Sequence, residues 1–544
     1  MKIIQEFAWK ADLNFITGNQ RRLVYAVLIV FVLLVTVLRV DFKAVPFEDA
    51  AILMRYAENF AGGYGIVWNQ GEQPVDGATD FLFMVLTGGL QRLSGFGINS
   101  IVFAVNIASH VISLLIVFYV LWRVLSTPLV LSLISVGYLI LGPGAALISA
   151  QFGTPFFTML VSVQWLVALK IIIRGSPSKF EPFGFGIFSL LIGLTRPEGV
   201  FLSFFILCTV VYNLGFVPSL RIVKSYLLIM ILLGGSYFVW RWNYFGFPLP
   251  NPYYKKSSSG LDVESLKFAS IYTIRFILPF LPVMFLGLIE KPGIKKLVTV
   301  IAPVLGFTLI FSLIDGSMNF SGRFQYPNLF IVAMGWWLPI SKLKIIDYVK
   351  PNAVLSQRIK AIALLFLVSY TIASYLLQIK YSSSPIYKDG RYDVGIILKD
   401  YESKNLKIAC SEAGLIPFIS GLKTLDTWGL NDQAITHAGL VSEEMLEEFD
   451  PDLIMYHGKY SAITSPSSNS AHERMGIVLK KFAESHGFEL VSNFGIDPFK
   501  SHFYYLKRGL PDFIEIKGRI KSLAYIWYET GSVCLDFTEF RRDK

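Results

Sequence analysis

The strongest constraint on the fold is a series of apolar segments, each close to 20 residues long and almost free of charge. A helix of about 20 apolar residues is what the hydrocarbon core of a bilayer requires. The chain is 53% hydrophobic, and its mean hydropathy is +0.54. The sequence therefore predicts a polytopic α-helical membrane protein.

The positions of the basic residues set the expected topology. The short apolar run at 81–93 is expected to lie at the membrane interface rather than to cross. With that run left out, the Lys and Arg clusters between spans fall on one side, which is the cytoplasmic side. Residues 43–97 and 380–544 then face outside, and the net charge of +10 reflects the loops rather than nucleic-acid binding. We expect about 11 crossings, at 23–42, 98–122, 128–147, 155–173, 183–195, 199–214, 225–242, 268–289, 297–314, 328–341 and 361–379.

Hydropathy falls after residue 380, and strand and helix patterns begin to alternate. Strands are expected at 407–410, 452–457 and 502–508, and an amphipathic helix at 473–486. A segment of this length is within the usual size of a domain. We therefore expect a transmembrane module at 1–380, with its external loop at 43–97, and a soluble extracytoplasmic α/β domain at 381–544.

Two adjacent carboxylates, Glu48 and Asp49, follow the first span directly. Behind them apolar residues recur at three- and four-residue spacing, which predicts a short amphipathic helix that ends at Gly62 and Gly63. The N-terminal end of a helix favours ionised carboxylates. Such a pair either caps the helix or carries chemistry, and its spacing alone leaves both readings open.

The remaining polar residues limit the chemistry. Before residue 380 the one histidine is His110, which is expected to be a packing residue inside a span. Cys208, Cys410 and Cys534 have no metal-binding spacing, and the latter two are expected to be free thiols. The membrane module therefore has no zinc triad, no Ser–His pair and no phosphate-binding Gly-rich loop. Carboxylates, cations and tyrosines remain, which suit transfer of a sugar from a lipid-linked phosphate.

Several external stretches carry a resemblance to a known group. FEDAAILMRYAENFAGGYGIVWNQGE resembles the first external loop of the GT-C glycosyltransferases. Four later stretches match further motifs of these enzymes in order: TRPEG at 195–199, YFGFPLPNPYYKK at 244–256, the run from Asp315 to Pro327, and SEAGLIPFISGLKTLDTWGLND at 411–432. The last of these is similar to the external domain in relatives of mycobacterial arabinofuranosyltransferases.

The resemblance implies a GT-C fold and an inverting enzyme with a polyprenyl-phosphate-linked sugar donor. It implies that one of Asp49 and Glu48 is the catalytic base. Residues expected to contact the donor phosphate are Arg323, Lys255, Lys256, Tyr253, Tyr254 and Arg275. Residues with a structural or substrate-binding role are Arg196, Glu198, Asn251, Asp315 and Asp426.

A structural reading stands beside each of these assignments. Arg323 could pair with Asp315, and Arg196 with Glu198, which is the reading we favour for that turn. Asp426 could cap a loop. The lysines could be solvated, the tyrosines could belong to the interfacial aromatic belt, and Arg275 could pair with a packed carboxylate as well as with phosphate.

The sequence departs from the family pattern at three places. Glu48 stands where relatives usually carry Asp, Asn251 is followed by Pro rather than Thr, and the second external loop, at 150–154, has no acid. That last departure puts in doubt any donor or metal contact from this loop.

The expected function is a hexosyl- or pentosyltransferase at the plasma membrane. Its acceptor is a hydroxyl of a cell-envelope glycan, lipid or protein on the outer face. No organic cofactor is expected, no metal ligands are assigned, and no nucleic-acid partner is expected. The alternative is a multi-pass transporter or lipid flippase, which would show paired repeats and broken helices at mid-bilayer. We find no internal repeat in the sequence.

Overall fold

The structure is a computed structural model, and its chain contacts divide it into two compact units, each described by itself below. The first unit comprises Met1–Phe42, Val102–Val239 and Ser258–Ser384, and the second comprises Lys43–Ile101, Trp240–Ser257 and Pro385–Lys544. The residues described are 18–256, 262–289, 291–313, 319–341, 369–380, 389–458, 470–497, 500–523, 528–529 and 532–533.

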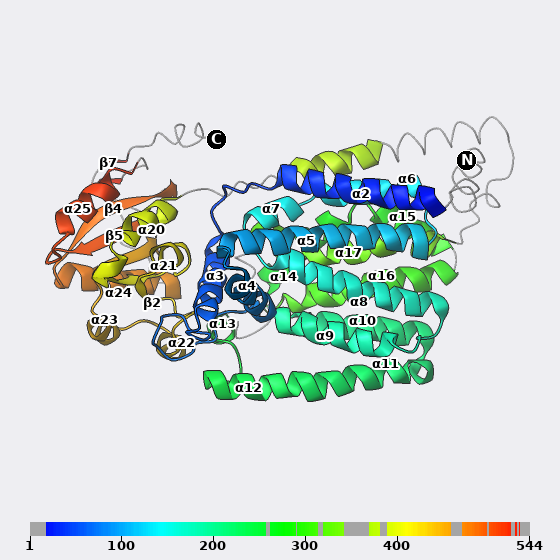
Figure 1. Cartoon of the computed structure of the whole chain (residues 1–544), viewed down its shortest axis with the longest axis horizontal. Coiled ribbons are helices and arrows are strands. Elements are labelled where there is room, and N and C mark those ends of the chain that lie inside the picture. Colours follow the sequence, from blue (N-terminus) through cyan, green and yellow to red (C-terminus); the bar gives the residue numbers. More distant parts are fainter. Residues whose placement is uncertain are drawn as a thin grey trace. The chain divides into compact units, whose positions relative to one another are not determined.

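Long apolar helices build the first unit (Figure 1). Within the described residues, six helices are long and apolar enough to cross a membrane, or seven if one bent pair counts as a single span. The chain is thus a multi-pass membrane protein, while the expected count of 11 stays a prediction. The helices are α2 (Gly18–Arg39), α5 (Ile98–Tyr119, continued by a π-turn to Val124), α6 (Leu129–Ile140), α7 (Gly144–Ser149), α8 (Thr154–Arg174), α9 (Glu181–Thr195), α10 (Gly199–Leu214), α11 (Phe216–Ile229), α12 (Gly235–Phe245), α14 (Val263–Ile277), α15 (Leu281–Phe285), α16 (Lys291–Ile310) and α17 (Tyr326–Gly335).

The packing of these helices follows their sequence order in part. α8 packs on α9 and α17, α9 on α10 and α11, and α10 on α16. Figure 1 shows these helices running side by side. His110, on α5, is buried and contacts the hydroxyl of Tyr326 at 3.3 Å through Nδ1, which fits the packing role expected for it.

The crossing expected at 268–289 is not one continuous helix in the structure, and whether it crosses stays a prediction. The structure has two helices there, α14 and the segment Leu281–Ile289, with an 81° bend between them. Pro279 and Pro282 lie at the break. Proline lacks the backbone N–H for an i to i−4 hydrogen bond, and its ring clashes with the preceding turn, so the helix cannot continue straight.

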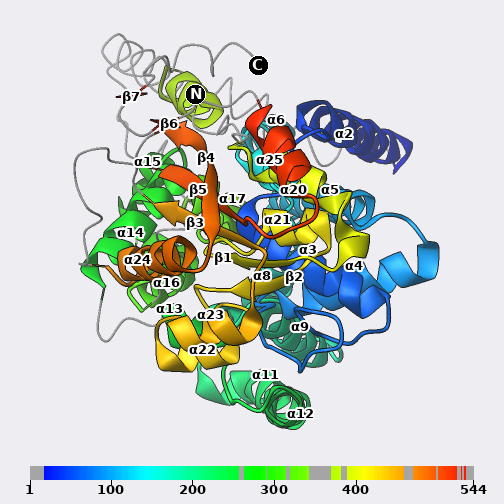
Figure 2. The ribbon, with the colours of Figure 1, turned by 90° about the vertical axis from the view of Figure 1, so that its left-hand side faces the viewer.

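A five-stranded sheet is the centre of the second unit (Figure 2). Its strand order is β2-β1-β3-β5-β4. β1 pairs in parallel with β2 and β3, whereas β5 pairs antiparallel with β3 and β4. The strands are β1 (Lys407–Cys410), β2 (Lys423–Asp426), β3 (Leu453–Gly458), β4 (Phe488–Asp497) and β5 (Lys500–Lys507).

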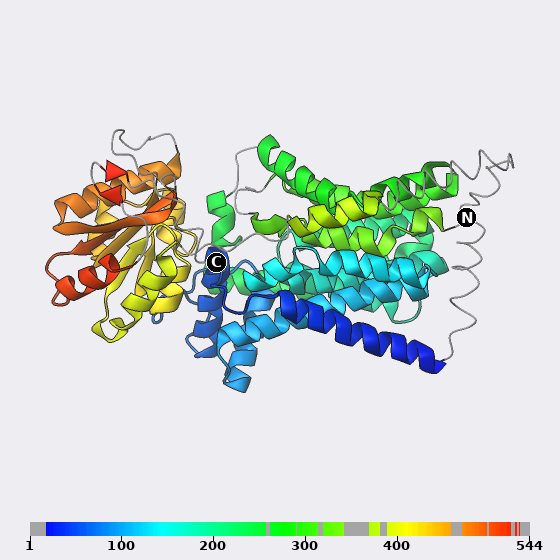
Figure 3. The same ribbon diagram turned by 90° about the horizontal axis from the view of Figure 1, so that it is seen from above.

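Helices cover both faces of this sheet (Figure 3). On one face, α24 supplies Met475, Leu479 and Phe482 to a buried cluster with Ile454 and Tyr505 of the strands. The other face carries α20 and α25. The helices of this part are α20 (Arg391–Lys399), α21 (Leu415–Ser420), α22 (Gln433–Ala438), α23 (Glu443–Phe449), α24 (Ala471–Ser485) and α25 (Phe513–Lys521).

Two earlier stretches of the chain belong to the same unit. They carry α3 (Glu48–Ala61), α4 (Phe81–Ser94) and α13 (Asn251–Lys256). α3 packs on α4 and on α21, and α13 packs on α22. The contacts thus group residues 43–101 with residues from 385 onward, and the division of the chain at residue 380 stays a prediction.

Candidate functional site

The acidic pair opens α3, as the sequence predicts. Phe47 precedes the helix in extended conformation and gives no side-chain cap. Glu48 and Asp49 are the acidic residues of the first helical turn. Gly62 follows the last helical residue. Carboxylates at this end of a helix are stabilised by the helix dipole. The side chains of successive helical residues point about 100° apart, so the two acids face different surroundings.

Glu48 is bound on both carboxylate oxygens. Its Oε2 accepts a hydrogen bond from Nη1 of Arg391 at 2.8 Å, and its Oε1 accepts one from the backbone N–H of Gly414. A Cβ at residue 414 would lie 2.6 Å from Oε1 of Glu48 and closer still to its backbone oxygen, so only glycine fits there. Burial raises the pKa of Glu48, and the charge of Arg391 opposes this effect.

Arg391 gathers three carboxylates at the start of α20. Besides Glu48 it binds both oxygens of Asp389 through Nε, at 3.0 Å, and pairs with Oε2 of Glu412. Burial disfavours charge at Glu412, yet Arg391 and His502 hold the pKa of that carboxyl well below its usual range. One guanidinium therefore faces three carboxylates in a buried network.

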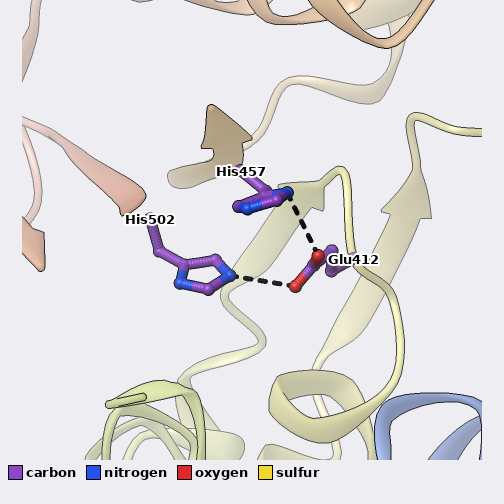
Figure 4. Close-up of side chains that lie close together, drawn as sticks. All are labelled: Glu412, His457 and His502. Carbon is purple, nitrogen blue, oxygen red and sulfur yellow. Dashed lines mark hydrogen bonds and ion pairs between the residues drawn. The ribbon is translucent and has the colours of Figure 1, made fainter. Parts of the chain in front are cut away.

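Two histidines also contact the carboxylate of Glu412 (Figure 4). Nε2 of His502 lies 2.9 Å from Oε2 of Glu412, and Nδ1 of His457 lies 3.4 Å from Oε1. Both histidines come from paired positions on β3 and β5, and Glu412 follows β1. Burial lowers the pKa of His457 to about 4, so its imidazole is neutral at physiological pH.

Asp49 is half-buried at the second position of α3. Glu48 is fixed within this unit by Arg391 and Gly414, and the helix turns the side chain of Asp49 about 100° away from that of Glu48. Whether Asp49 acts as a base stays a prediction.

Two polar residues of the first motif, Arg55 on α3 and Asn69 after it, have a structural role. Arg55 is buried and donates to the carbonyl oxygens of Trp68, Pro417 and Leu422 at 2.6–2.9 Å, and to Oδ1 of Asn69 at 3.0 Å. Asn69 in turn bonds the backbone N–H and C=O of Thr424 on β2, both at 2.9 Å. These bonds fasten residues 55–69 to the edge of the sheet.

The stretch 244–256 is held by the same unit. Nδ2 of Asn251 donates to the carbonyl oxygens of Gly429 and Asp432 at 2.9 and 3.1 Å, so its role is structural. Lys255 donates to the carbonyl oxygen of Gly439 at 2.8 Å and stacks on Trp428. These contacts tie α13 to the loops after β2.

The other predicted residues of this stretch are less constrained. Tyr253 is exposed and Tyr254 is half-buried, with its ring 5.0 Å from that of His437. Lys256 ends α13, and its side chain lies outside the described part. A contact of these residues with donor phosphate stays a prediction.

Asp426 caps a loop. Its carboxylate accepts hydrogen bonds from the backbone N–H groups of Trp428, Gly429 and Asn431 and from Nδ2 of Asn431, at 2.9–3.1 Å. Burial raises the pKa of Asp426 to about 6, and the hydrogen bonds oppose this effect. The structural reading of this residue is therefore the one that its contacts favour.

The first unit holds the remaining predicted cations. Arg323 is buried and lies over the rings of Phe152 and Phe324, at 4.1 and 4.8 Å. Arg196 lies over the same Phe324 ring at 5.1 Å and pairs with Glu198 at 2.7 Å, as we favoured for this turn. One aromatic ring thus brings the two arginines together, although they are far apart in the sequence.

Two further residues of this unit complete the predicted set. Arg275, half-buried on α14, lies just before the proline break. Asp315 lies outside the described residues, so its pairing with Arg323 is untested. Glu48 and Arg323 belong to different units, and a site that they share stays a prediction.

Comparisons with known proteins address the fold. ArnT from Cupriavidus metallidurans in the apo state matches with a TM-score of 0.56 at 13% identity, over 89% of this chain and 98% of that one. The same protein bound to undecaprenyl phosphate matches with a TM-score of 0.54 at 11% identity, over 88% and 97%. A third match is the archaeal oligosaccharyltransferase AglB from Archaeoglobus fulgidus, in complex with an inhibitory peptide and a dolichol-phosphate. Its TM-score is 0.50 at 10% identity, and the match covers 93% of this chain and 76% of that one.

The chain has the GT-C fold. The fold resemblance drawn from the motifs is thereby confirmed. A family model described as a domain of unknown function (DUF8728) matches residues 380–507, which include Arg391, Glu412 and both histidines of the network. No curated protein sequence matches the chain. The family match thus covers the sheet of the second unit from β1 to β5.

Sequence reasoning missed most of the network around Glu48. Glu412 lies within the SEAG stretch that carries the resemblance, but Arg391, Asp389, His457 and His502 fit no motif. A signal did exist: His457 and His502 each lie in a predicted strand, and strands that pair bring such residues together. The pairing of β3 with β5 could not be foreseen from local pattern.

Proposed function

We propose that this chain is an inverting glycosyltransferase with a polyprenyl-phosphate-linked sugar as donor. The observation that carries the proposal is the acidic pair at the start of α3, in which Glu48 is fixed by Arg391 while the neighbouring Asp49 faces another direction. The fold shared with ArnT, which binds undecaprenyl phosphate, and with AglB supports it.

In this proposal Asp49 is the catalytic base. The acceptor hydroxyl oxygen attacks the anomeric carbon while the bond from that carbon to the phosphate oxygen breaks, so the configuration inverts. The hydroxyl proton passes to the Asp49 carboxylate, and the polyprenyl phosphate leaves with the bonding electrons. Glu48, held at two points, positions the helix end and is not the proton acceptor.

The leaving phosphate requires cations. We assign this role to Arg323, with Arg275, Lys255, Lys256, Tyr253 and Tyr254 as further donor contacts. The acceptor is a hydroxyl of a cell-envelope glycan, lipid or protein on the outer face of the membrane. Hexosyl and pentosyl transfer are both compatible with these residues.

The decisive test is sugar transfer by purified protein in detergent, with a polyprenyl-phosphate sugar as donor. General-base catalysis contributes about 10²–10⁴-fold, so Asp49→Asn should lower transfer by at least about 10²-fold with donor binding unchanged. Glu264→Gln is the matched control, because Glu264 is an exposed carboxylate in the first turn of another helix, α14. If Asp49→Asn keeps more than half of wild-type activity, the base assignment is wrong.

The orientation of the chain has its own test. We propose that 43–97 and 380–544 face outside and that 342–360 face the cytoplasm. Single cysteines replace Ser94, Ser341 and Ser467 in a chain whose own cysteines are changed to serine, and intact cells are labelled with an impermeant thiol reagent. Labelling at 94 and 467 is expected, and labelling at 341 alone would reverse the proposed topology.

A further inference from the structure

We propose that Glu412, His457 and His502 form a binding site for a divalent transition metal of the zinc class. The site belongs to the sheet of the second unit and lies outside the residues assigned to sugar transfer. The proposal does not rest on the proposed transferase activity.

The sheet places the three residues together. Glu412 follows the carboxyl end of β1, and His457 lies at the carboxyl end of β3, which runs parallel to β1. Ligand sites in such sheets lie beyond the carboxyl ends of parallel strands. His502, near the start of β5, is the cross-strand partner of His457, and their rings stack with centroids 5.1 Å apart. The segment after β1 and the strands β3 and β5 therefore contribute one donor group each.

The donor atoms converge. One nitrogen from each imidazole and one carboxylate oxygen all lie within 4.8 Å of one another, and Figure 4 shows both ring nitrogens directed at the carboxylate. Zinc bound at about 2.0–2.2 Å in tetrahedral geometry requires donor atoms about 3.3–3.5 Å apart. Small side-chain rotations reach that spacing. Two histidines and one glutamate are a known zinc ligand set that leaves a fourth position open.

The charge balance favours a cation. Glu48, Asp389 and Glu412 carry three carboxylates, and Arg391 pairs with all three as a single guanidinium. Buried charges need compensation, because transfer from water costs several kcal/mol per ion. A divalent cation beside Glu412 would add positive charge to a cluster in which the carboxylates outnumber the guanidinium. His502 is buried, with a side chain 4% exposed, so the cation would be held largely away from water.

A metal at this site would also affect the position of Glu48 through shared hydrogen bonds. Oε2 of Glu412 accepts from Arg391, and the same Nη1 of Arg391 donates to Glu48. Outer-sphere partners orient metal ligands and are oriented by them. A bound metal would thus fix Glu412, then Arg391, and through it the first residue of α3.

The test is zinc binding by the full-length protein, purified in detergent with an affinity tag that contains no histidine. The protein is stripped with a chelator and titrated with ZnCl₂ against a chromophoric competitor, and bound zinc is counted by elemental analysis. One tight equivalent is expected. His457→Gln, His502→Gln and Glu412→Gln should each weaken binding at least about 100-fold, since the loss of an outer-sphere partner alone costs about 10–100-fold.

Two controls bracket the site. His472→Gln removes an imidazole whose ring lies 5.6 Å from that of His457 but which is not one of the three converging donors, so zinc should stay bound. His486→Gln tests the exposed group of Glu443, Glu447 and His486, which is the rival metal site among the described residues. Loss of the tight equivalent in either control, but not in the three ligand variants, would overturn the assignment.

A wild-type measurement keeps the proposal falsifiable if the ligand variants fail to fold. X-ray absorption at the zinc edge of the protein with one equivalent bound should show two imidazoles and oxygen, with no sulfur. Absence of a tight equivalent, sulfur ligation, or a shell of oxygen alone would each contradict the proposal. The zinc measurements use neither donor nor acceptor sugar. A failed sugar-transfer assay would therefore leave the zinc result unaffected.

Discussion

Arg391 donates a hydrogen bond to Glu48 at 2.8 Å across 343 residues of sequence. The contact joins the start of α20 to the first residue of α3. Because the same guanidinium also binds Asp389 and Glu412, the position of the acidic pair depends on a cation that no local pattern around it contains.

The first prediction concerns this arginine. Arg391→Gln leaves three buried carboxylates without their cation, which should destabilise the second unit by about 3–5 kcal/mol. The control is Arg519→Gln, because Arg519 pairs with Asp400 on the surface, where an ion pair is worth about 0–1 kcal/mol. Thermal unfolding in detergent with a chelator present measures both. Equal melting temperatures for the two variants would contradict the prediction, and Arg391→Lys should fall between Arg391→Gln and the wild type.

The second prediction concerns Gly414. A methyl group there would meet the backbone and carboxylate of Glu48, so Gly414→Ala should displace the carboxylate from its backbone donor. We expect a melting temperature several degrees lower, because an overpacked contact costs about 1–3 kcal/mol. Gly518→Ala is the matched control on α25: nothing lies within 4 Å of its added Cβ, and alanine favours a helix. A Gly414→Ala protein as stable as Gly518→Ala would show that Glu48 is not held there.

The third prediction uses the pH dependence of stability. Burial raises the pKa of Glu58, on α3, to about 7, against the charges of Lys399 and Arg55. The folded state thus binds more protons than the unfolded state between about pH 4 and pH 7, so this residue's contribution is complete below about pH 4 and is lost as the pH rises through 7. Glu58→Gln cannot ionise, so its melting temperature relative to wild type should increase from pH 5 to pH 8.

The expected size of this effect is about 1–3 kcal/mol, since each pKa unit corresponds to about 1.4 kcal/mol and Glu58 is not completely buried. Differential scanning fluorimetry at several pH values measures it. Glu484→Gln, at an exposed glutamate on α24, is measured beside it as the matched substitution on the surface. A flat profile for Glu58→Gln would mean that its carboxyl ionises as in the unfolded chain.

The fourth prediction addresses Arg323 in the first unit. If it stabilises the departing phosphate, Arg323→Gln should lower kcat/KM by about 10²–10³-fold, the usual loss for a group that binds developing negative charge. Arg323→Lys should recover part of this loss. Arg174→Gln, at an exposed ion pair with Glu181, should leave transfer unchanged. A loss of stability without a loss of transfer in Arg323→Gln would make this arginine a packing residue over Phe152.

The sequence predicted what depends on local pattern. The bounds expected for α3, for β1 and for most of the apolar helices agree with the structure within a few residues, because periodicity and glycine caps determine them. It did not predict β2, whose four residues KTLD are too short for a period-two signal, or the break at Pro279 inside an otherwise apolar run. A hydropathy pattern indicates how long an apolar segment is and that it is buried. It does not indicate whether the helix changes direction within that segment.

The candidate site was predicted only where it depends on local sequence pattern. Glu48 and Asp49 could be found, because two adjacent acids beside a membrane span are unusual. Arg391 and the two histidines could not, because only the strand order of the sheet brings them to Glu412. Asn251 and Asp426 were found as motif residues, yet their contacts are with backbone groups and support the loops.

The bonds from Arg55 and Asn69 to residues 417–424 have a consequence for biogenesis. Residues 55–69 leave the ribosome more than 300 residues before the segment to which they are bonded, so these bonds cannot form while the intervening helices are being inserted. A chain that stops before residue 385 would therefore reach the membrane with its helices in place and its acidic pair unsupported. Completion of synthesis, rather than insertion of the helices, is therefore the step at which the bonds to residues 417–424 can form.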